Sequence, residues 1–274
     1  GESGCGKTTV ARMILNLLPA DGGRILYKGK DICGLCDREM KPFRKEIQIV
    51  FQDPYGSLNP RMTVGQTLSE GLRMIGIRGR TGRREQIERL LGLVGMAPAA
   101  VDRYPHEFSG GQRQRIGIAR ALSVEPALVV CDEPVSALDV SIQAQIINLL
   151  KDLQDRLGLS YVFISHDLNV VGYLCHQVAV MYKGQIMEYA PAEAVFENPL
   201  HPYTRVLLAA LPDLERGKGP PAPGLEGERA ETALTLPEGC RFQSRCPENN
   251  DRCRLFSGDL TMAGNEHYVR CWRM

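Results

Sequence analysis

The first eight residues constrain the fold of this chain more than any other segment. They read GESGCGKT, the G-x-x-x-x-G-K-T pattern of a phosphate-binding loop, and apolar residues at helical spacing follow. Glycines let backbone N–H groups turn towards an anion, and the start of the helix adds its positive dipole end. The pattern predicts that Lys7 reaches the β- and γ-phosphates of a nucleotide and that the Thr8 hydroxyl binds Mg²⁺. The other predicted phosphate-binding residues are Gly1, Ser3, Gly4, Cys5, Gly6 and Thr9. Taken alone, a glycine-rich turn without a ligand would fit the same letters.

Short apolar runs alternate with amphipathic segments over much of the chain. Strands are predicted over residues 47–52, 127–132, 161–166 and 177–182, and helices are predicted to begin at Lys7, Gly110, Ser141 and Leu168. Strands that alternate with helices favour an α/β fold with a parallel sheet covered on both faces. The segment from Met62 to Tyr104 has no convincing strand pattern, so two or three helices are expected there as an insertion.

The composition changes after about residue 190. We predict a first domain over residues 1–190, with a helical insertion at about 62–122, and an extension over residues 191–274. Within the extension, residues 215–236 are rich in Pro, Gly and charge and are typical of a linker, and residues 240–271 carry four cysteines. The net charge of +1 provides no general attraction to nucleic acid or to an anionic membrane.

Two acids follow the apolar run ALVVC. Asp132 and Glu133 would stand at the C-terminal end of a buried strand, which is the sheet edge where ligands bind in open α/β sheets. Asp132 suits Mg²⁺, and Glu133 is placed to polarise an attacking water. The alternative is a strand that ends in two solvated acids.

A Ser-Gly-Gly turn opens the predicted helix in FSGGQRQRIGIARAL. The Ser109 side chain and the N–H groups of Gly110 and Gly111 would form a second anion-binding turn. Alone, the same letters fit a helix capped by serine.

In this order, the motifs resemble those of the ABC transporter nucleotide-binding subunits. GESGCGKTT is similar to Walker A, VVCDEP to Walker B, and SGGQ, Ser109–Gln112, to the signature. Gln52 resembles the Q-loop glutamine, Asp139 the D-loop aspartate and His166 the switch histidine. The resemblance implies a P-loop NTPase with a RecA-like core, a helical signature subdomain and a small C-terminal cysteine-bearing extension.

In this family, two subunits pair head to tail around ATP. The resemblance implies that Lys7, Thr8, Gln52, Asp132, Glu133 and His166 serve one nucleotide, with Glu133, His166 and Gln52 catalytic and Thr8, Gln52 and Asp132 on Mg²⁺. Ser109 and Gly111 of the signature would serve the partner's nucleotide, and Gly110, Gln112 and Asp139 of the D-loop are further predicted nucleotide-binding residues.

Two further segments resemble one branch of the family. VFQDPYGSLNPRMTV and NPLHPYTRVLLAALP are similar to the second ATPase subunit of oligopeptide, dipeptide or nickel importers. This likeness implies a heterodimer with a homologous ATPase, two transmembrane permeases and, indirectly, an extracytoplasmic solute-binding protein, at the cytoplasmic face of the membrane. A soluble ABC-type ATPase acting on nucleic acid or ribosomes is the alternative. Such chains usually add coiled coils, zinc insertions or a second core, which this sequence lacks.

Four cysteines crowd the end of the sequence: Cys240, Cys246, Cys253 and Cys271. Their spacing is too long for the usual zinc hairpin, and disulfides do not suit reducing cytosol. Four thiolates could hold an iron–sulfur cluster, and the resemblance to these importers implies one. We expect a [4Fe–4S] cluster, with zinc and free thiols as the alternatives.

The family places a strand and an adenine-stacking aromatic residue before the phosphate loop. Neither precedes Gly1 in this sequence, so we expect an N-terminally truncated piece of a longer subunit that binds ATP poorly.

Overall fold

The computed structural model describes residues 1–211, 239–256 and 258–273. Contacts divide the chain into two compact units, Gly1–Lys7 with His166–Met274, and Thr8–Ser165, and each is described by itself. The predicted linker at residues 215–236 lies outside the described residues.

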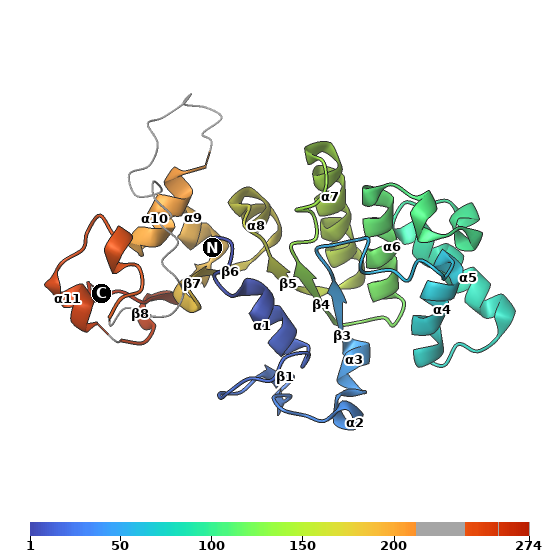
Figure 1. Cartoon of the computed structure of the whole chain (residues 1–274), viewed down its shortest axis with the longest axis horizontal. Helices are drawn as coiled ribbons and strands as arrows, with labels where there is room; N and C mark the ends of the chain where they lie inside the picture. Colours follow the sequence, from blue (N-terminus) through green and yellow to red (C-terminus); the bar gives the residue numbers. More distant parts are fainter. Residues whose placement is uncertain (212–238, 257, 274) are drawn as a thin grey trace. The chain divides into compact units, whose positions relative to one another are not determined.

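The unit Thr8–Ser165 contains a parallel sheet. Strands β3 (Ile47–Val50), β4 (Leu128–Asp132) and β5 (Ser160–Ile164) lie side by side in that order (Figure 1). Both pairs are parallel, as the sequence predicts for these three strands. The apolar core on this sheet includes Ala11, Leu15, Ile32, Met40, Ile47, Val130 and Ile164.

Helices alternate with the strands of this sheet along the chain. Helix α1 (Lys7–Ile14) and helix α7 (Val140–Leu157) begin at or within one residue of the predicted positions. Gly158 ends α7 in a left-handed conformation, which glycine adopts without steric cost. The smaller elements of this part are β1 (Leu26–Tyr27), β2 (Lys30–Asp31), α2 (Asp37–Met40) and α3 (Phe43–Glu46).

The predicted helical insertion contains α4 (Val64–Met74), α5 (Arg80–Leu93) and α6 (Gly110–Leu122). Two short 3-10 turns, η1 (Pro98–Asp102) and η2 (Pro105–Glu107), join α5 to α6. Helix α6 packs against both β3 and α7, so the helical part is joined to the parallel sheet through this helix.

The second unit holds an antiparallel sheet of order β6-β7-β9-β8. The strands are β6 (Gln177–Tyr182), β7 (Gln185–Pro191), β8 (Thr261–Gly264) and β9 (His267–Val269). The prediction was wrong in giving segment 177–182 a place in a parallel sheet. Lys183 and Gly184 have φ values of 42° and 78°, which form a tight turn that sends the chain back antiparallel.

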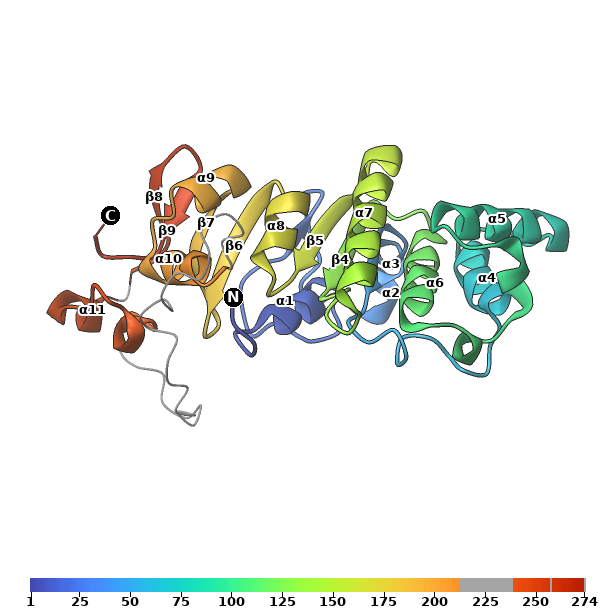
Figure 2. The same ribbon diagram turned by 90° about the horizontal axis from the view of Figure 1, so that it is seen from above.

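Helices α8 (Leu168–Leu174), α9 (Ala192–Glu197) and α10 (Pro202–Ala209) complete this sheet unit, and α9 packs on β6 and β7 (Figure 2). The C-terminal part adds η3 (Gln243–Arg245) and α11 (Asp251–Leu255). Tyr182, Met187, Tyr203 and Phe242 share one buried core, so the cysteine-bearing segment is packed with β6, β7 and α10.

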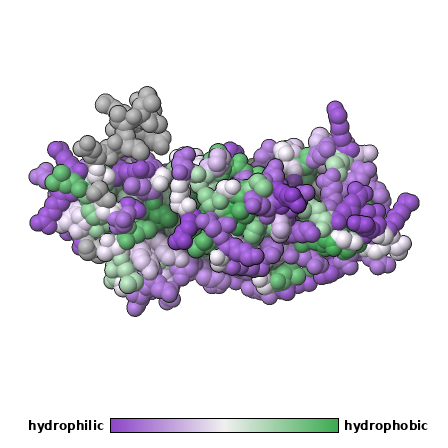
Figure 3. Space-filling model, turned by 90° about the horizontal axis from the view of Figure 1, so that it is seen from below, coloured by the Kyte–Doolittle hydropathy of each residue, from purple (hydrophilic) through white to green (hydrophobic). Residues whose placement is uncertain are grey.

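The surface in Figure 3 mixes hydrophilic residues with scattered hydrophobic ones. In the part of the chain that the structure describes, no helix has the length and apolar character required to cross a membrane.

Candidate functional site

The phosphate loop closes around its own lysine. Lys7 Nζ donates to the carbonyl oxygens of Gly1 at 2.8 Å and of Glu2 at 2.9 Å. Gly4 and Gly6 have φ values of 77° and 105°, a region that side chains with a Cβ rarely adopt. The glycines of the pattern therefore give the loop its curvature, and the curvature places the ammonium group against the first two residues.

The same loop rests on the β6–β7 hairpin. A Cβ on Gly1 would come within 2.1 Å of the Met181 carbonyl oxygen, so only glycine fits there. Cys5 is buried, and its carbonyl accepts a hydrogen bond of 2.8 Å from the backbone N–H of Gly184. Ser3 and Gly4, in contrast, are exposed.

Thr8 and Asp132 meet at the C-terminal end of β4. The Thr8 hydroxyl donates to Asp132 Oδ1 at 3.1 Å, and Asp132 is 6% exposed. Both are hard oxygen donors of the kind that Mg²⁺ prefers, so this pair fits the predicted ion. Thr9 is exposed on α1.

Glu133 has a strained backbone. Its φ of 46° lies in the left-handed region, which a residue with a Cβ occupies at a cost. Its N–H donates to the carbonyl of Ile164 at 3.0 Å, and its own carbonyl accepts from the N–H and hydroxyl of Ser136. Gln52 Nε2 donates to Glu133 Oε2 at 3.4 Å. The structure thus brings together the predicted glutamine and the predicted water-activating acid.

The signature segment forms a helix cap. The Ser109 hydroxyl accepts from the Gln112 N–H, and the Gln112 side chain accepts from the Ser109 N–H, which is the reciprocal capping box of an α-helix. Gly110 starts the helix. A Cβ on Gly111 would lie 2.4 Å from the Ile142 side chain, so this glycine allows α6 to approach α7. Binding of a nucleotide by this segment stays a prediction.

Three residues of α6 contact the segment that follows β3, and none of them was among the residues predicted from the sequence. Arg113 places its guanidinium 3.8 Å from the centre of the Tyr55 ring. Gln114 donates to the Phe51 carbonyl at 3.4 Å, and Arg120 donates to the Ser57 carbonyl. A signal was present in the sequence, because Arg113 and Arg120 are seven residues apart and therefore share one face of a helix.

The remaining predicted residues lie on exposed turns. Asp139 precedes α7, and its carbonyl accepts from the N–H groups of Ile142 and Gln143. His166 is exposed and directly follows Ser165 after β5. It belongs to the unit of Gly1–Lys7, whereas Gln52, Asp132 and Glu133 belong to the other unit, so the structure does not place His166 relative to these three.

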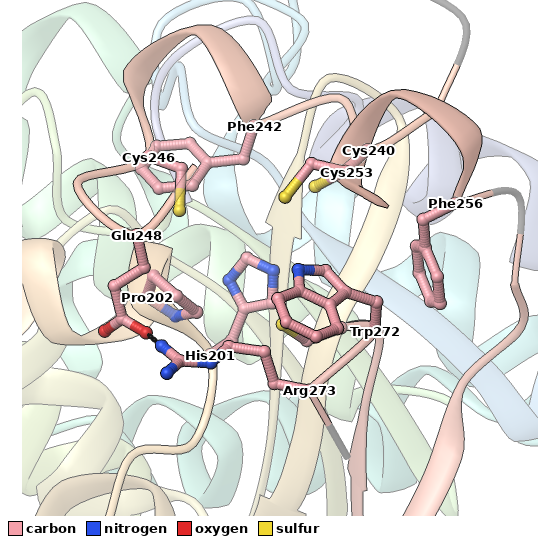
Figure 4. A pocket seen from close by; sticks show the side chains of 11 residues that line it. His201, Pro202, Cys240, Phe242, Cys246, Glu248, Cys253, Phe256, Trp272 and Arg273 are labelled. Carbon is pink, nitrogen blue, oxygen red and sulfur yellow. Dashed lines mark hydrogen bonds and ion pairs between the residues drawn. The ribbon is translucent and has the colours of Figure 1, made fainter. Parts of the chain in front are cut away.

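The prediction of an iron–sulfur cluster is wrong. Cys240, Cys246, Cys253 and Cys271 do line one pocket, part of which is seen in Figure 4. The space inside it is about 10 Å³, roughly what one water molecule needs. Within residues 1–211, 239–256 and 258–273, no group of three or more His, Cys, Asp or Glu side chains is arranged to hold a metal ion.

Burial explains how the thiols are accommodated in this pocket. It raises the pKa of Cys246 to about 11 and also raises the pKa values of Cys240 and Cys271, which favours neutral thiols over the thiolates that bind metals. Burial also lowers the pKa of His201 to about 4, so this neighbour is neutral as well. Cys240, Cys246 and Cys271 therefore pack as partly buried thiols beside Phe242, and the ion pair of Arg273 with Glu248 lines the same pocket.

The parallel sheet, the glycine-rich loop and the acids at the end of β4 define a P-loop nucleotide hydrolase. A family model described as "ABC transporter" matches residues 1–136, and one described as "Oligopeptide/dipeptide transporter, C-terminal region" matches residues 187–253.

Individual proteins with similar sequences or structures lead to the same family. A Brucella ovis protein named as a peptide import ATP-binding protein is 49% identical over 273 residues, which cover 100% of this chain and 86% of that protein. The oligopeptide transport ATP-binding protein OppF of Salmonella typhimurium is 50% identical over 258 residues, 92% of this chain and 76% of OppF. The solved structure of a dimeric, post-hydrolysis ATP-binding cassette with ADP and Pi has a TM-score of 0.61 and 28% identity, covering 70% of this chain and 83% of that one. The chain belongs to the ATP-binding proteins of ABC transporters, and it is an ABC ATPase.

Proposed function

We propose that this chain binds and hydrolyses ATP to power an ABC importer for peptides. The observation that carries the ATPase role is the hydrogen bond between Thr8 and Asp132, which joins the phosphate-loop helix to the acidic end of β4. The names of relatives about half identical to this chain support peptides as the solute class, with nickel as the alternative.

Each residue then has a distinct role in hydrolysis. The Lys7 ammonium and backbone N–H groups of the predicted loop residues, among which Glu2 is not counted, bind the phosphates, and Thr8, Asp132 and Gln52 would hold Mg²⁺. When bound, the ion would neutralise phosphate charge.

Glu133 accepts a proton from the attacking water. The water oxygen bonds to the γ-phosphorus, and the bond from the γ-phosphorus to the oxygen that bridges the β- and γ-phosphates breaks. The contact with Gln52 supports this role, because it orients the Glu133 carboxylate. His166 would contact the γ-phosphate.

The partner's nucleotide would be served by Ser109–Gln112 and Asp139. The support is the exposed position of Ser109 and Asp139 and the dimeric state of the solved cassette. We infer a homologous ATPase as the partner, two permeases in the membrane and a peripheral location at the cytoplasmic face, with a solute-binding protein on the other side.

We also propose the division into an ATPase domain over residues 1–190 and an extension over 191–274. The family model matched to residues 187–253 supports a boundary near residue 190.

Copurification tests this assignment. The tagged protein should recover two membrane permeases and a second ABC ATPase from detergent-solubilised membranes. Recovery of ribosomes or DNA in their place would overturn the importer assignment and favour the alternative of a soluble ABC-type ATPase.

A further inference from the structure

Glu2 of the phosphate loop is held through its backbone and its side chain. Its N–H donates to the Tyr203 hydroxyl at 3.1 Å, and its carbonyl accepts from Lys7 Nζ at 2.9 Å. Its two carboxylate oxygens accept from the two terminal nitrogens of Arg245, each at 2.9 Å. One loop residue therefore connects the phosphate-binding lysine to two side chains that lie some two hundred residues further along the chain.

The contact between Arg245 and Glu2 has the geometry of a strong ion pair. Two parallel N–H···O bonds between a guanidinium and a carboxylate fix both distance and orientation. The two side chains are 23% and 26% exposed, so water screens the pair only in part. The hydrogen bonds to Glu2 also raise the pKa of Arg245, which agrees with a close ion pair.

The segment that carries Arg245 is anchored in the core. Phe242, three residues earlier, is fully buried, and its ring centre lies 5.1 Å from that of Tyr203 and 5.3 Å from that of Tyr182. Arg245 itself lies 5.8 Å from the centre of the Tyr182 ring. The backbone that carries Arg245 is therefore fixed by the packing of Phe242, and this fixes where Arg245 can meet Glu2.

A second arginine of the same segment supports the loop indirectly. Arg241 donates to the carbonyl of Lys183 in the β6–β7 turn. The next residue of that turn, Gly184, donates its N–H to the Cys5 carbonyl in the phosphate loop at 2.8 Å. The segment that carries Arg241 and Arg245 therefore contacts the loop directly at Glu2, and it contacts Cys5 only indirectly, through the β6–β7 turn.

Charge gives this contact a consequence for ligand binding. A carboxylate inside a loop that binds phosphates repels the ligand, because like charges a few ångströms apart interact unfavourably. The positive charge of Arg245 compensates the negative charge of Glu2 at this position.

We propose that Arg245 and Tyr203 are positioning residues for the nucleotide, and that through Arg245 the cysteine-bearing segment, residues 239–256, sets the geometry and charge of the phosphate loop. This inference rests on the proposed ATPase function. It gives the cysteine-bearing segment a part in ATP affinity although it lies far from the phosphate loop in sequence.

The test is ATP affinity in the full chain, measured by titration with a fluorescent ATP analogue, together with KM and kcat for hydrolysis. In Arg245→Gln, the Kd and KM should rise on the order of tenfold, whereas kcat at saturating ATP should change much less. Arg254→Gln, an exposed change of the same charge on α11, is the matched control and should leave the Kd unchanged. Tyr203→Phe, which removes only the hydroxyl, should raise the Kd by a smaller factor.

The double variant Glu2→Gln with Arg245→Gln separates charge from general damage. It removes the uncompensated carboxylate, so it should recover a large part of the affinity lost in Arg245→Gln. If Arg245→Gln does not fold, Arg245→Lys replaces it in the comparison. Lysine keeps the positive charge but cannot form the two parallel hydrogen bonds, so its Kd should still exceed the Kd of Arg254→Gln.

Equal ATP affinity in Arg245→Gln and Arg254→Gln would overturn the inference, and so would a double variant no better than Arg245→Gln. Failure of the unmodified protein to bind ATP would instead contradict the proposed function, so the two failures are distinguishable.

Discussion

At the scale of single residues, Glu133 combines strain with chemistry. A left-handed backbone at a residue with a Cβ costs of order 1–3 kcal/mol and persists only where the surroundings enforce it. Here the surroundings are the carbonyl of Ile164 and the two donors of Ser136, which hold the backbone on both sides. In this conformation the Glu133 carboxylate, just after β4, accepts a hydrogen bond from Gln52, just after β3.

Glu133→Gln should retain ATP binding and lose turnover. Glutamine has nearly the same shape but cannot accept the proton of water, so the rate should fall by about 10²–10⁴-fold. Release of inorganic phosphate measures this change. Glu125→Gln is the matched control, because Glu125 is also left-handed, with φ of 54°, but precedes β4. Undiminished turnover in Glu133→Gln would refute the assigned role.

Single residues also show what the sequence can predict. Thr8, Asp132, Gln52 and Glu133 were predicted from motifs, and the structure joins them in two hydrogen-bonded pairs. The role of Glu2 was not predicted, because its partner Arg245 is 243 residues away and no local pattern encodes such a contact.

At the scale of elements, α6 links the signature to the segment after β3. The start of the helix at Gly110 was predicted because a serine cap and an apolar stripe are local signals. Its contacts with residues 51–57 were not predicted, because they depend on how α6 packs against β3. The β6–β7 hairpin was missed for a related reason, since Lys-Gly is not among the common hairpin pairs.

Arg120→Gln should weaken this link. Burial lowers the pKa of Arg120, and its guanidinium donates to the Ser57 carbonyl and lies 5.6 Å from the Phe51 ring centre. Loss of these contacts should lower the free energy of unfolding by about 1–3 kcal/mol in denaturant titrations. Arg73→Gln, on the exposed face of α4, should change it by less than about 0.5 kcal/mol. Equal stabilities of the two variants would argue against this role.

His201 should make the stability of the α10 region depend on pH. Its Nδ1 accepts from the Tyr203 N–H at the start of α10, and burial lowers its pKa from 6.5 to about 4. Between pH 6.5 and pH 4, His201 is protonated in the unfolded chain but neutral in the folded chain. The free energy of unfolding should therefore fall as the pH drops from about 6.5 to about 4. Glu188 and Arg205 are the charged groups that act on it, in opposite directions.

His201→Asn tests this dependence, because asparagine keeps a capping acceptor but does not titrate. Relative to this variant, the unmodified protein should lose up to about 3 kcal/mol across that pH range in denaturant titrations. The exposed His106→Asn should follow the unmodified protein. Parallel pH profiles for the His201 variant and the unmodified protein would contradict the prediction.

At the scale of the whole molecule, the C-terminal segment is part of a folded unit with Gly1–Lys7. The sequence suggested a tail held together by a metal centre, because four cysteines are a strong compositional signal. The structure shows an apolar core instead, in which Phe242, Tyr182 and Tyr203 each contact the other two. Aromatic residues so far apart in sequence give no periodic pattern, and the cysteines were therefore the more visible feature.

The central claim is that ATP hydrolysis on this chain powers peptide import, and transport in proteoliposomes tests it most directly. Vesicles loaded with ATP would carry the two permeases, the partner ATPase and this protein, with the solute-binding protein and a labelled peptide outside. We predict ATP-dependent accumulation of peptide that Glu133→Gln abolishes and Glu125→Gln does not. Transport of nickel without transport of peptide, or peptide uptake that is unchanged in Glu133→Gln, would contradict the account.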